Sequence, residues 1–325
     1  MANYYETGSF DVCYNLAYEE YLLERGDSDA LMLWQDSPSV VIGLNQNAAE
    51  EVDALEAARR GVTVVRRRTG GGAVYHDLGN LNYSFITEAG DEAALSFESF
   101  TRPVCEALAS LGVRAEASGR NDITVAGLKV SGTARRLHKG RVLHHGTLLF
   151  RTDREAMAAL LRPDSGKFSG KAAKSVRSRV GQLCDFLPEG TTLAEFKSAL
   201  LRSLMPGGAE ITPLPAEALG DIARRAELYR SRDWTWTRAP DFGFRNSRRF
   251  PGGGITVSLD VSHGEIRAAH ISGDFMAAAP CGALISALER CRYEPEAVRA
   301  ALSPLELGAM LGGISLDELM EVLFG

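Results

Sequence analysis

The chain has few cysteines, and no two of them are spaced to act together. Five occur in 325 residues, at positions 13, 105, 184, 281 and 291, and none belongs to a Cys-x-x-Cys pair. An odd and scattered set argues against a disulfide framework and against a cysteine zinc site. We therefore expect a reducing, cytoplasmic location.

Long apolar runs and a targeting segment are also missing. No stretch reaches the roughly 20 apolar residues that a membrane span needs. The first residues, Met1 to Glu6, lack the basic and apolar regions of a signal peptide. The net charge of −6 does not suit nonspecific nucleic-acid binding. We expect neither a membrane nor a nucleic acid as partner, and we find no internal repeat.

What is present is the composition of an ordinary globular protein, with 45% hydrophobic and 24% charged residues. The length allows one large domain or two. Periodicity predicts a mixture of helices and strands. The helices are expected at 14–24, 48–60, 95–111, 153–161, 192–204, 215–229, 280–291 and 315–324. The strands are expected at 31–34, 40–44, 62–65, 80–86, 122–126, 128–134, 142–150, 255–260 and 265–272.

A boundary is expected near residues 245–254, where arginines, a proline and three glycines gather. Before it, the strand expected at 80–86 alternates polar and apolar residues. Asn80, Asn82 and Ser84 should share one face, and Leu81, Tyr83 and Phe85 the other. The apolar face belongs to the core, whereas the polar face fits either a cavity or bulk water.

The most informative segment runs from Arg66 to Asp77, with the sequence RRRTGGGAVYHD. Three arginines end an apolar strand, and three glycines follow at once. Glycine lets the backbone turn sharply and approach a ligand closely, and successive N–H groups can form a nest for an anion. The segment therefore favours a phosphate or carboxylate ligand. At most one or two of the arginines should reach it, and the others should be solvated.

Three further clusters accompany this loop. Lys129 lies among small residues, Gly127, Ser131 and Gly132, so it has space to reach into a pocket, although most lysines are simply exposed. His144 and His145 are adjacent on a strand and should point to opposite faces, which argues against a shared metal. The basic run 174–180 follows a polar stretch, which suits either a solvated face or a mobile lid over a polyanion.

Together these clusters resemble the lipoate–protein ligase family, in the single-chain form with an accessory C-terminal domain. The resemblance rests on Arg67, on the run from Thr69 to Asn80, on Asn121-Asp122, and on Lys129-Val130-Ser131-Gly132. It continues in the run 144–149 and in the run 175–180. Order and spacing match nearly the whole chain. Arg68 departs from the family, because this position is often small or apolar in relatives.

The resemblance implies an α+β fold. The expected catalytic domain, 1–247, is biotin/lipoate ligase-like, with mixed sheets and flanking helices related to class II aminoacyl-tRNA synthetases. A small α/β accessory domain is expected at 251–325. The implied activity has two steps, in which lipoate and Mg-ATP form lipoyl-adenylate and an acceptor lysine then takes the lipoyl group.

The resemblance also implies roles for individual residues. Lys129 would be the catalytic residue, Asp122 would contact Mg²⁺ or nucleotide, and the stretch 165–181 would order over the adenylate. The residues implied in ATP binding are Arg67, Gly72, Ala73, Val74, Tyr75, Asp122, Lys129, Arg177 and Arg179. Those implied in lipoate binding are Gly70, Gly71, His76, Lys129 and His145.

The implied partners are lipoyl domains of 2-oxoacid dehydrogenase E2 subunits, the glycine-cleavage H protein, or both, and we expect a monomer. Two alternatives stay open. An octanoyltransferase of the same fold would use a carrier-protein donor and a cysteine nucleophile, for which Cys184 is the candidate. Its neighbours Leu183 and Phe186 suggest a half-buried structural thiol instead. A non-catalytic lipoate or nucleotide sensor is the other alternative, and a biotin ligase fits less well.

Overall fold

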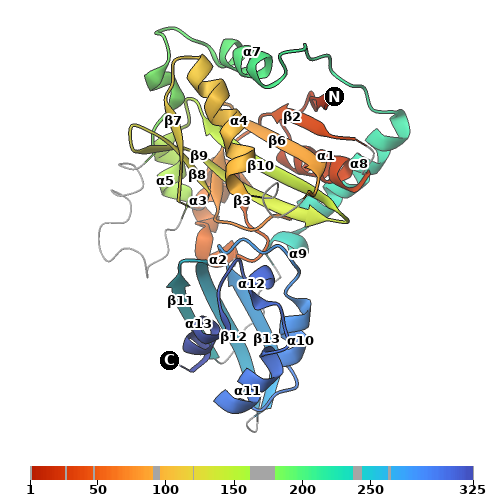
Figure 1. Ribbon diagram of the computed structural model, residues 1–325, viewed down its shortest axis with the longest axis vertical. Coiled ribbons are helices and arrows are strands. Elements are labelled where there is room, and N and C mark those ends of the chain that lie inside the picture. Colours follow the sequence, from red (N-terminus) through yellow and green to blue (C-terminus); the bar gives the residue numbers. More distant parts are fainter. Residues whose placement is uncertain are drawn as a thin grey trace. The chain divides into compact units, whose positions relative to one another are not determined.

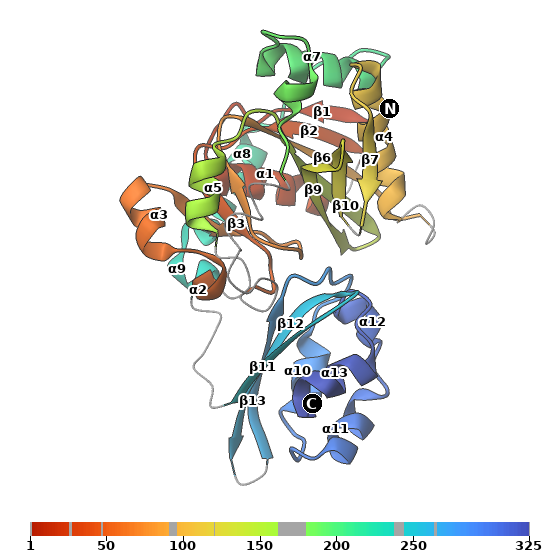
Figure 2. The same ribbon diagram turned by 90° about the vertical axis from the view of Figure 1, so that its left-hand side faces the viewer.

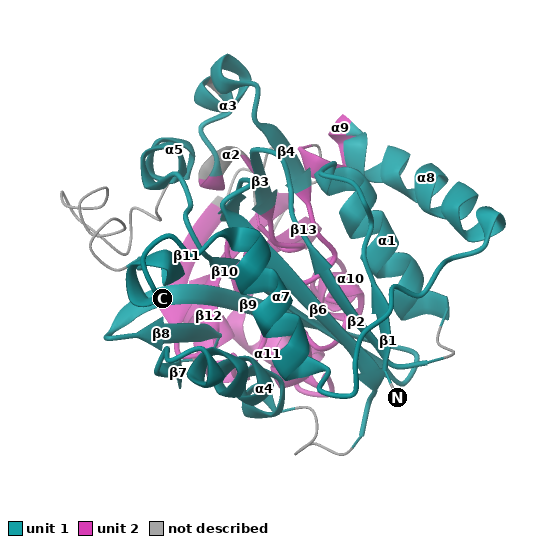
Figure 3. Cartoon of the chain, turned by 90° about the horizontal axis from the view of Figure 1, so that it is seen from above, with its two compact units in different colours: residues 1–41, 52–65, 74–231 teal, residues 42–51, 66–73, 232–325 magenta. Residues whose placement is uncertain are grey.

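The structure is a computed structural model that describes residues 2–25, 28–46, 48–90, 96–119, 121–161, 180–236, 244–262 and 265–324. The chain divides into two compact units, shown in different colours in Figure 3. Unit 1 contains residues 1–41, 52–65 and 74–231. Unit 2 contains residues 42–51, 66–73 and 232–325, so it combines two short N-terminal segments with the C-terminal part of the chain.

Unit 1 is built on a seven-stranded mixed sheet (Figure 1). Only the β1–β2 pair is parallel, and the other neighbours are antiparallel. The strands, in their order across the sheet, are β1 (Asn3–Tyr5), β2 (Ala30–Trp34), β6 (Asn80–Glu88), β10 (Arg141–Leu149), β9 (Leu128–His138), β8 (Asp122–Val125) and β7 (Ala115–Ser118).

Helices cover both faces of this sheet. On one face, α4 (Phe97–Ser110) and α7 (Leu193–Leu204) bury the apolar side chains of the strands. On the other face lie α1 (Val12–Arg25) and α8 (Ala216–Arg230), which pack against each other (Figure 3). The main core joins sheet residues Leu31, Leu33, Leu81, Tyr83 and Leu148 to helix residues Val104, Leu108, Phe196 and Leu200.

A smaller sheet has the order β4 (Thr63–Arg66), β3 (Ser39–Ile42), β5 (Val74–His76). The helix expected at 48–60 is two helices, α2 (Ala48–Glu51) and α3 (Ala54–Arg60). The break has a local cause, because the Asp53 side chain accepts from the backbone N–H of Glu56 at 3.0 Å and starts a new helix. The helix α5 (Arg154–Leu160) packs on α3, and the short 3-10 helix η1 (Leu183–Phe186) follows later in the chain.

The C-terminal part of unit 2 is a three-stranded antiparallel sheet with helices on one face (Figure 2). The segment 245–254, which the sequence suggests as a boundary, contains most of the first strand. The strands are β11 (Phe244–Phe250), β12 (Gly253–Ser262) and β13 (Glu265–Gly273). The helices on that face are α10 (Gly282–Leu288), α11 (Pro295–Leu302), α12 (Leu307–Met310) and α13 (Leu316–Phe324), whereas the short helix α9 (Arg232–Thr235) precedes the first strand.

The core of this part joins Ile255, Val257 and Leu259 of β12 to Leu284, Leu288, Val298 and Leu319 of the helices. The predicted hairpin and the predicted first and last helices are present, whereas α11 and α12 were not predicted. In the described part of the chain, no helix combines the length and apolar character that crossing a membrane requires.

Candidate active site

The polar face of strand β6 is buried inside unit 1, so it does not face bulk water. The side chain of Ser84 donates to Glu19 of helix α1 at 2.5 Å and accepts from the indole N–H of Trp34 at 3.1 Å. Glu19 also bonds Nδ1 of His145, on β10, at 2.8 Å. Both carboxylate contacts are buried, so polar groups rather than apolar ones fill this face of the sheet.

A second buried pair, His76 and Asp36, contacts the same polar face of β6 through Asn82. Nδ1 of His76 lies 2.7 Å from Oδ2 of Asp36, and Asn82 donates to the same oxygen at 3.3 Å. The Trp34 and His76 rings form a T-shaped pair, with their planes at 74° and their centroids 6.1 Å apart. The sequence analysis missed both acidic partners, Glu19 and Asp36. Their signal is a charged residue in or beside an apolar segment, which is ambiguous without the fold.

The two adjacent histidines point to opposite faces, as predicted. His144 stacks on Phe100 of helix α4, with ring centroids 4.7 Å apart and planes within 10°. Burial lowers the pKa of His144 to about 3, so its ring is neutral at physiological pH. His144 is therefore part of the apolar side of the sheet, and only His145 reaches the polar side.

Lys129 lies beside the second acidic residue that the sequence singled out. Its Nζ is 2.7 Å from Oδ1 of Asp122, and both side chains are about one-third exposed. A Cβ built on Gly132 would come within 3.1 Å of Nζ, so a side chain there would displace the lysine. The β8–β9 turn, Ala126-Gly127, has positive φ at both residues, which is the geometry of a tight hairpin. Strand pairing and turn together hold Lys129 and Asp122 side by side.

The glycine loop lies in unit 2, and Arg67 determines its shape. The Arg67 guanidinium donates to the hydroxyl of Thr69 at 2.9 Å and to the carbonyls of Gly70 and Gly72 at 2.6 and 2.8 Å. The side chain is almost fully buried. Gly43 faces the loop, and a Cβ there would be 2.1 Å from the Gly71 carbonyl oxygen. Only glycine fits at position 43.

The expectation that the remaining arginines are solvated is wrong. Arg66 is 1% exposed, because its guanidinium donates to five backbone carbonyls. Those carbonyls belong to Gly43, Leu44, Gln46, Trp234 and Thr235. Arg68 is half-buried, with its guanidinium carbon 4.9 Å from the Trp234 ring centroid. The three arginines therefore contribute to local structure, and Arg66 is a structural residue.

No cluster of three or more His, Cys, Asp or Glu side chains among the described residues could hold a metal on its own. Asp122 offers a single, partly exposed carboxylate. That suits Mg²⁺, which proteins usually hold through one or two carboxylates together with substrate phosphates and water. Arg177 and Arg179, both predicted to bind nucleotide, lie outside the described residues.

Cys184, the candidate nucleophile of the alternative reading, is half-buried in η1, as its neighbours suggest. Its Sγ lies 3.6 Å from Oε1 of Gln182 and 3.7 Å from Oδ1 of Asp185. Neither group is a base of the kind that activates a thiol in nucleophilic catalysis. This environment favours a structural role.

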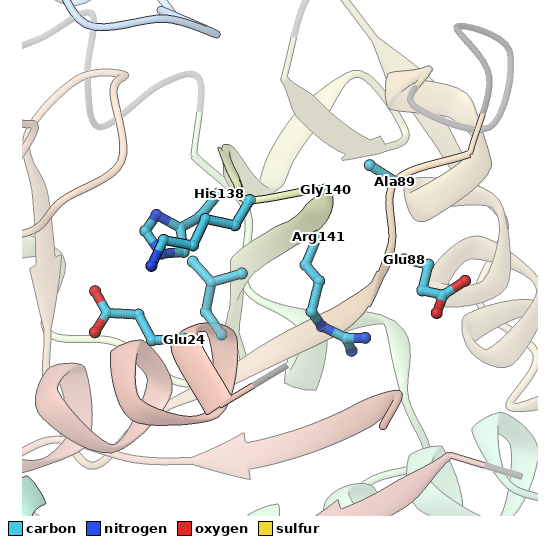
Figure 4. Close-up of a pocket in the computed structure, with 8 residues that line it drawn as sticks. Glu24, Glu88, Ala89, His138, Gly140 and Arg141 are labelled. Atoms are coloured by element: carbon cyan, nitrogen blue, oxygen red, sulfur yellow. The ribbon is translucent and has the colours of Figure 1, made fainter. Parts of the chain in front are cut away.

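A separate cavity of about 240 Å³ lies in unit 1 (Figure 4). It is lined by the end of α1, the end of β6 and the turn that joins β9 to β10. None of the predicted site residues lines it. The lining residues are Leu23, Glu24, Glu88, Ala89, His138, Lys139, Gly140 and Arg141.

Two protein families match the sequence. The family described as "Lipoyl protein ligase A/B catalytic domain" matches residues 11–205, and "Bacterial lipoate protein ligase C-terminus" matches residues 239–323. The lipoate-protein ligase LplJ of Bacillus subtilis is 37% identical over 319 residues, which is 95% of this chain and 96% of the relative. Lipoate–protein ligase 1 of Staphylococcus aureus is 36% identical over 318 residues, 96% of this chain and 97% of the relative.

Solved structures of similar proteins agree with the sequence matches. LipL1 of P. falciparum, in complex with lipoate, superposes with a TM-score of 0.78 at 25% identity, over 94% of this chain and 95% of that one. The bi-partite lipoate protein ligase of Thermoplasma acidophilum, studied with its E2 lipoyl domain, gives 0.66 at 29% identity, over 75% and 99%. A lipoate-protein ligase A bound with ATP gives 0.63 at 28% identity, over 72% and 98%.

Proposed function

The chain belongs to the lipoate–protein ligase family and is a ligase, and we propose that it attaches free lipoate to protein lysines in two steps. In the first step the lipoate carboxylate attacks the α-phosphorus of ATP, giving lipoyl-AMP and pyrophosphate. In the second step the amine of an acceptor lysine attacks the acyl carbon, giving an amide and AMP. We include octanoate as a second acyl substrate in this proposal.

The observation that carries the proposal is the placement of Lys129. A carboxylate that approaches a phosphate must overcome repulsion between two anions. The Lys129 ammonium, held beside Asp122 and above Gly132, can neutralise both partners and then stabilise charge on the acyl oxygen. The chemistry is electrostatic and positional, with no covalent enzyme intermediate.

For the nucleotide we propose the glycine loop, with Gly72 to Tyr75 as the backbone that approaches it and Arg67 as the loop's organiser and phosphate contact. The nearest heavy atom to a Cβ on Gly72 is 4.0 Å away, so this part of the loop has room for a ligand. Asp122 would hold Mg²⁺ that arrives with ATP, and Arg177 and Arg179 would add positive charge. A similar protein binds ATP, which supports the assignment.

For the acyl chain we propose Gly70, Gly71, His76 and His145 as contacts. His76 and His145 have the burial expected of residues that line an enclosed site. Gly70 also has a structural reason to be glycine, because its Cβ would lie 2.7 Å from the carbonyl oxygen of Phe275. Two of the similar structures hold lipoate or lipoic acid, which supports an acyl site in this chain.

As acceptors we propose lipoyl domains of 2-oxoacid dehydrogenase E2 subunits, the glycine-cleavage H protein, or both, with the ligase acting as a monomer. A similar ligase was studied with its E2 lipoyl domain. We also propose a catalytic domain at 1–247 and an accessory domain at 251–325. The two separate family matches, to residues 11–205 and 239–323, support a chain of two domains.

The test is the intact mass of a purified apo lipoyl domain after incubation with the enzyme, lipoate and Mg-ATP, beside a reaction without ATP. An ATP-dependent gain of one lipoyl group supports the proposal. Transfer from octanoyl carrier protein without ATP, and no gain from free lipoate, would replace it with the octanoyltransferase reaction. No transfer from either donor to either acceptor class would reject both activities.

A further inference from the structure

A fully buried carboxylate, Asp36, collects hydrogen bonds from three different elements of unit 1. It is 0% exposed and lies in the short connection between β2 and β3. Asn15 of α1 donates to its Oδ1 at 2.8 Å, and Asn82 of β6 donates to its Oδ2 at 3.3 Å. His76, at the end of β5, contacts Oδ2 at 2.7 Å. A buried charge with this many partners is fixed in place, since moving it would strand several polar groups.

The contact with Asp36 fixes the orientation of the His76 ring. Nδ1 faces the Asp36 carboxyl group, so Nε2 is the ring nitrogen directed away from it. Nε2 is buried and has no hydrogen-bond partner among the described residues. A buried polar atom without a partner carries a free-energy cost. A bound ligand that supplies a partner would remove this cost.

The arrangement lies on the same face of the sheet as Lys129. Directly paired residues on neighbouring strands point to the same face. Such pairing forms a row across four strands, which we call the cross-strand row: Asp122, Gly132, Thr147 and Asn82. Lys129 stands over one end of the row, at Gly132, and Asp36 is bonded to its other end, at Asn82. Neighbouring strands lie about 4.8 Å apart, so the four-strand row spans about 14 Å.

We propose that Asp36 is a positioning residue that holds His76 with Nε2 directed at the bound acyl substrate. The inference rests on the proposed function, in which His76 contacts lipoate. Asp36 itself touches no substrate and acts only through the imidazole. The hydrogen bond between Nδ1 and Asp36 fixes the ring, and burial of the pair keeps water from competing for Nε2.

The first test is Asp36→Asn, which keeps the size of the side chain but removes its charge and one acceptor oxygen. The KM for lipoate should rise about tenfold, while the KM for ATP and the kcat at saturating lipoate stay near wild type. His76→Gln should raise the lipoate KM similarly, and the double variant should be no worse than His76→Gln. A purely structural role for Asp36 would lower stability and kcat without this selective change, or would add to the His76 effect, and either result overturns the proposal.

A matched control is Glu20→Gln, another buried carboxylate changed to its amide. Glu20 accepts from the Tyr229 hydroxyl at 3.0 Å and lies 3.6 Å from Arg136. It should change thermal stability without changing the lipoate KM. If Glu20→Gln raises the lipoate KM as much as Asp36→Asn does, the effect is general destabilisation and the proposal fails.

A measurement on the wild-type enzyme keeps the proposal falsifiable if Asp36→Asn does not fold. In ¹⁵N-histidine spectra, adding lipoate should shift the Nε2 resonance of His76 and leave that of His144, on the opposite face, unchanged. A His76 resonance that stays constant at saturating lipoate would overturn the inference, even if the wild-type enzyme ligates lipoate. Failure of the wild type to bind lipoate at all would instead reject the proposed function together with the inference.

Discussion

Nζ of Lys129 lies 2.7 Å from Oδ1 of Asp122, so the proposed catalytic lysine already has an anionic partner before any substrate binds. The pair is about one-third exposed, and a solvated ion pair is worth little in stability. Substrate anions can therefore displace the carboxylate at small cost. If Asp122 holds Mg²⁺ as proposed, its carboxylate would no longer pair with Lys129, and the ammonium would be available to the substrate anions.

Lys129→Ala should abolish formation of lipoyl-adenylate, with a loss of at least about 100-fold in pyrophosphate release. The reason is that the ammonium is proposed to lie where the two anions must meet, and alanine carries no charge to replace it. The matched control is Lys197→Ala, which removes another ion-paired lysine of unit 1, bound to Glu6 at 2.6 Å. Near-normal adenylation by the Lys129 variant would contradict the mechanism.

Alanine substitutions at two glycines of the loop should distinguish a steric effect on stability from an effect on ligand binding. Gly70→Ala should lower the melting temperature, because its Cβ would meet the Phe275 carbonyl oxygen at 2.7 Å. Gly72→Ala has open space, so its melting temperature should stay near wild type while its KM for ATP rises. Differential scanning fluorimetry and steady-state kinetics check the pair. An unchanged ATP KM for Gly72→Ala would argue against close approach of nucleotide there.

Arg67→Lys should weaken the binding of ATP about tenfold or more. A lysine ammonium cannot reproduce the planar fork that bonds Thr69, Gly70 and Gly72 at once, so the loop loses its shape. Isothermal titration with ATP is the direct measurement. Arg59→Lys, on the exposed surface, is the control and should bind ATP as the wild type does. Equal affinities for all three proteins would show that the fork is dispensable.

The pH dependence of stability should change in His144→Phe. Burial lowers the pKa of His144 from 6.5 to about 3. Between these values the unfolded chain binds a proton that the folded chain does not, so stability falls as the pH falls, by about 1.4 kcal/mol per pH unit for this group. Phenylalanine keeps the stack on Phe100 and removes the titration. Urea unfolding at several pH values should show that the free energy of unfolding falls less with falling pH in the variant than in the wild type. An equal fall in both proteins would contradict this prediction.

Cys184→Ser should leave lipoate ligation intact. The thiol is half-buried beside Gln182 and Asp185, and the proposed reaction makes no bond to sulfur. The intact-mass assay of the lipoyl domain measures this directly. A loss of transfer with folding retained would instead assign the thiol a chemical role.

Local patterns in the sequence predicted the features that depend on neighbouring residues. The alternation of residues 80–86 identified the two faces of β6, and the adjacency of His144 and His145 identified their opposite directions. Capping explains one difference, since Asp53 divides the helix expected at 48–60. The short strands β1, β5 and β7 were not predicted, because three or four residues show too little periodicity.

The partners of the site residues could not be predicted, because tertiary contacts supply them. Glu19 and His145 are 126 residues apart, and Asp36 and His76 are 40 apart. Arg66 looked like a solvated charge because its carbonyl partners, Trp234 and Thr235, come from a distant segment. The type of a residue indicates that it needs hydrogen-bond partners when buried, but only the fold shows which residues provide them.

The contacts of Arg66 also set a rule for dividing this chain in two. A ligase rebuilt as two polypeptides must keep residues 232–236 with the first piece, since their carbonyls hold the Arg66 guanidinium and the Trp234 indole donates back to the Arg66 carbonyl at 2.8 Å. A break placed at residues 237–243 keeps these hydrogen bonds within the first polypeptide. A break just before Arg232 separates the buried Arg66 guanidinium from two of its acceptors, the carbonyls of Trp234 and Thr235. We therefore expect a split after helix α9 to preserve folding and a split before it to destabilise the protein.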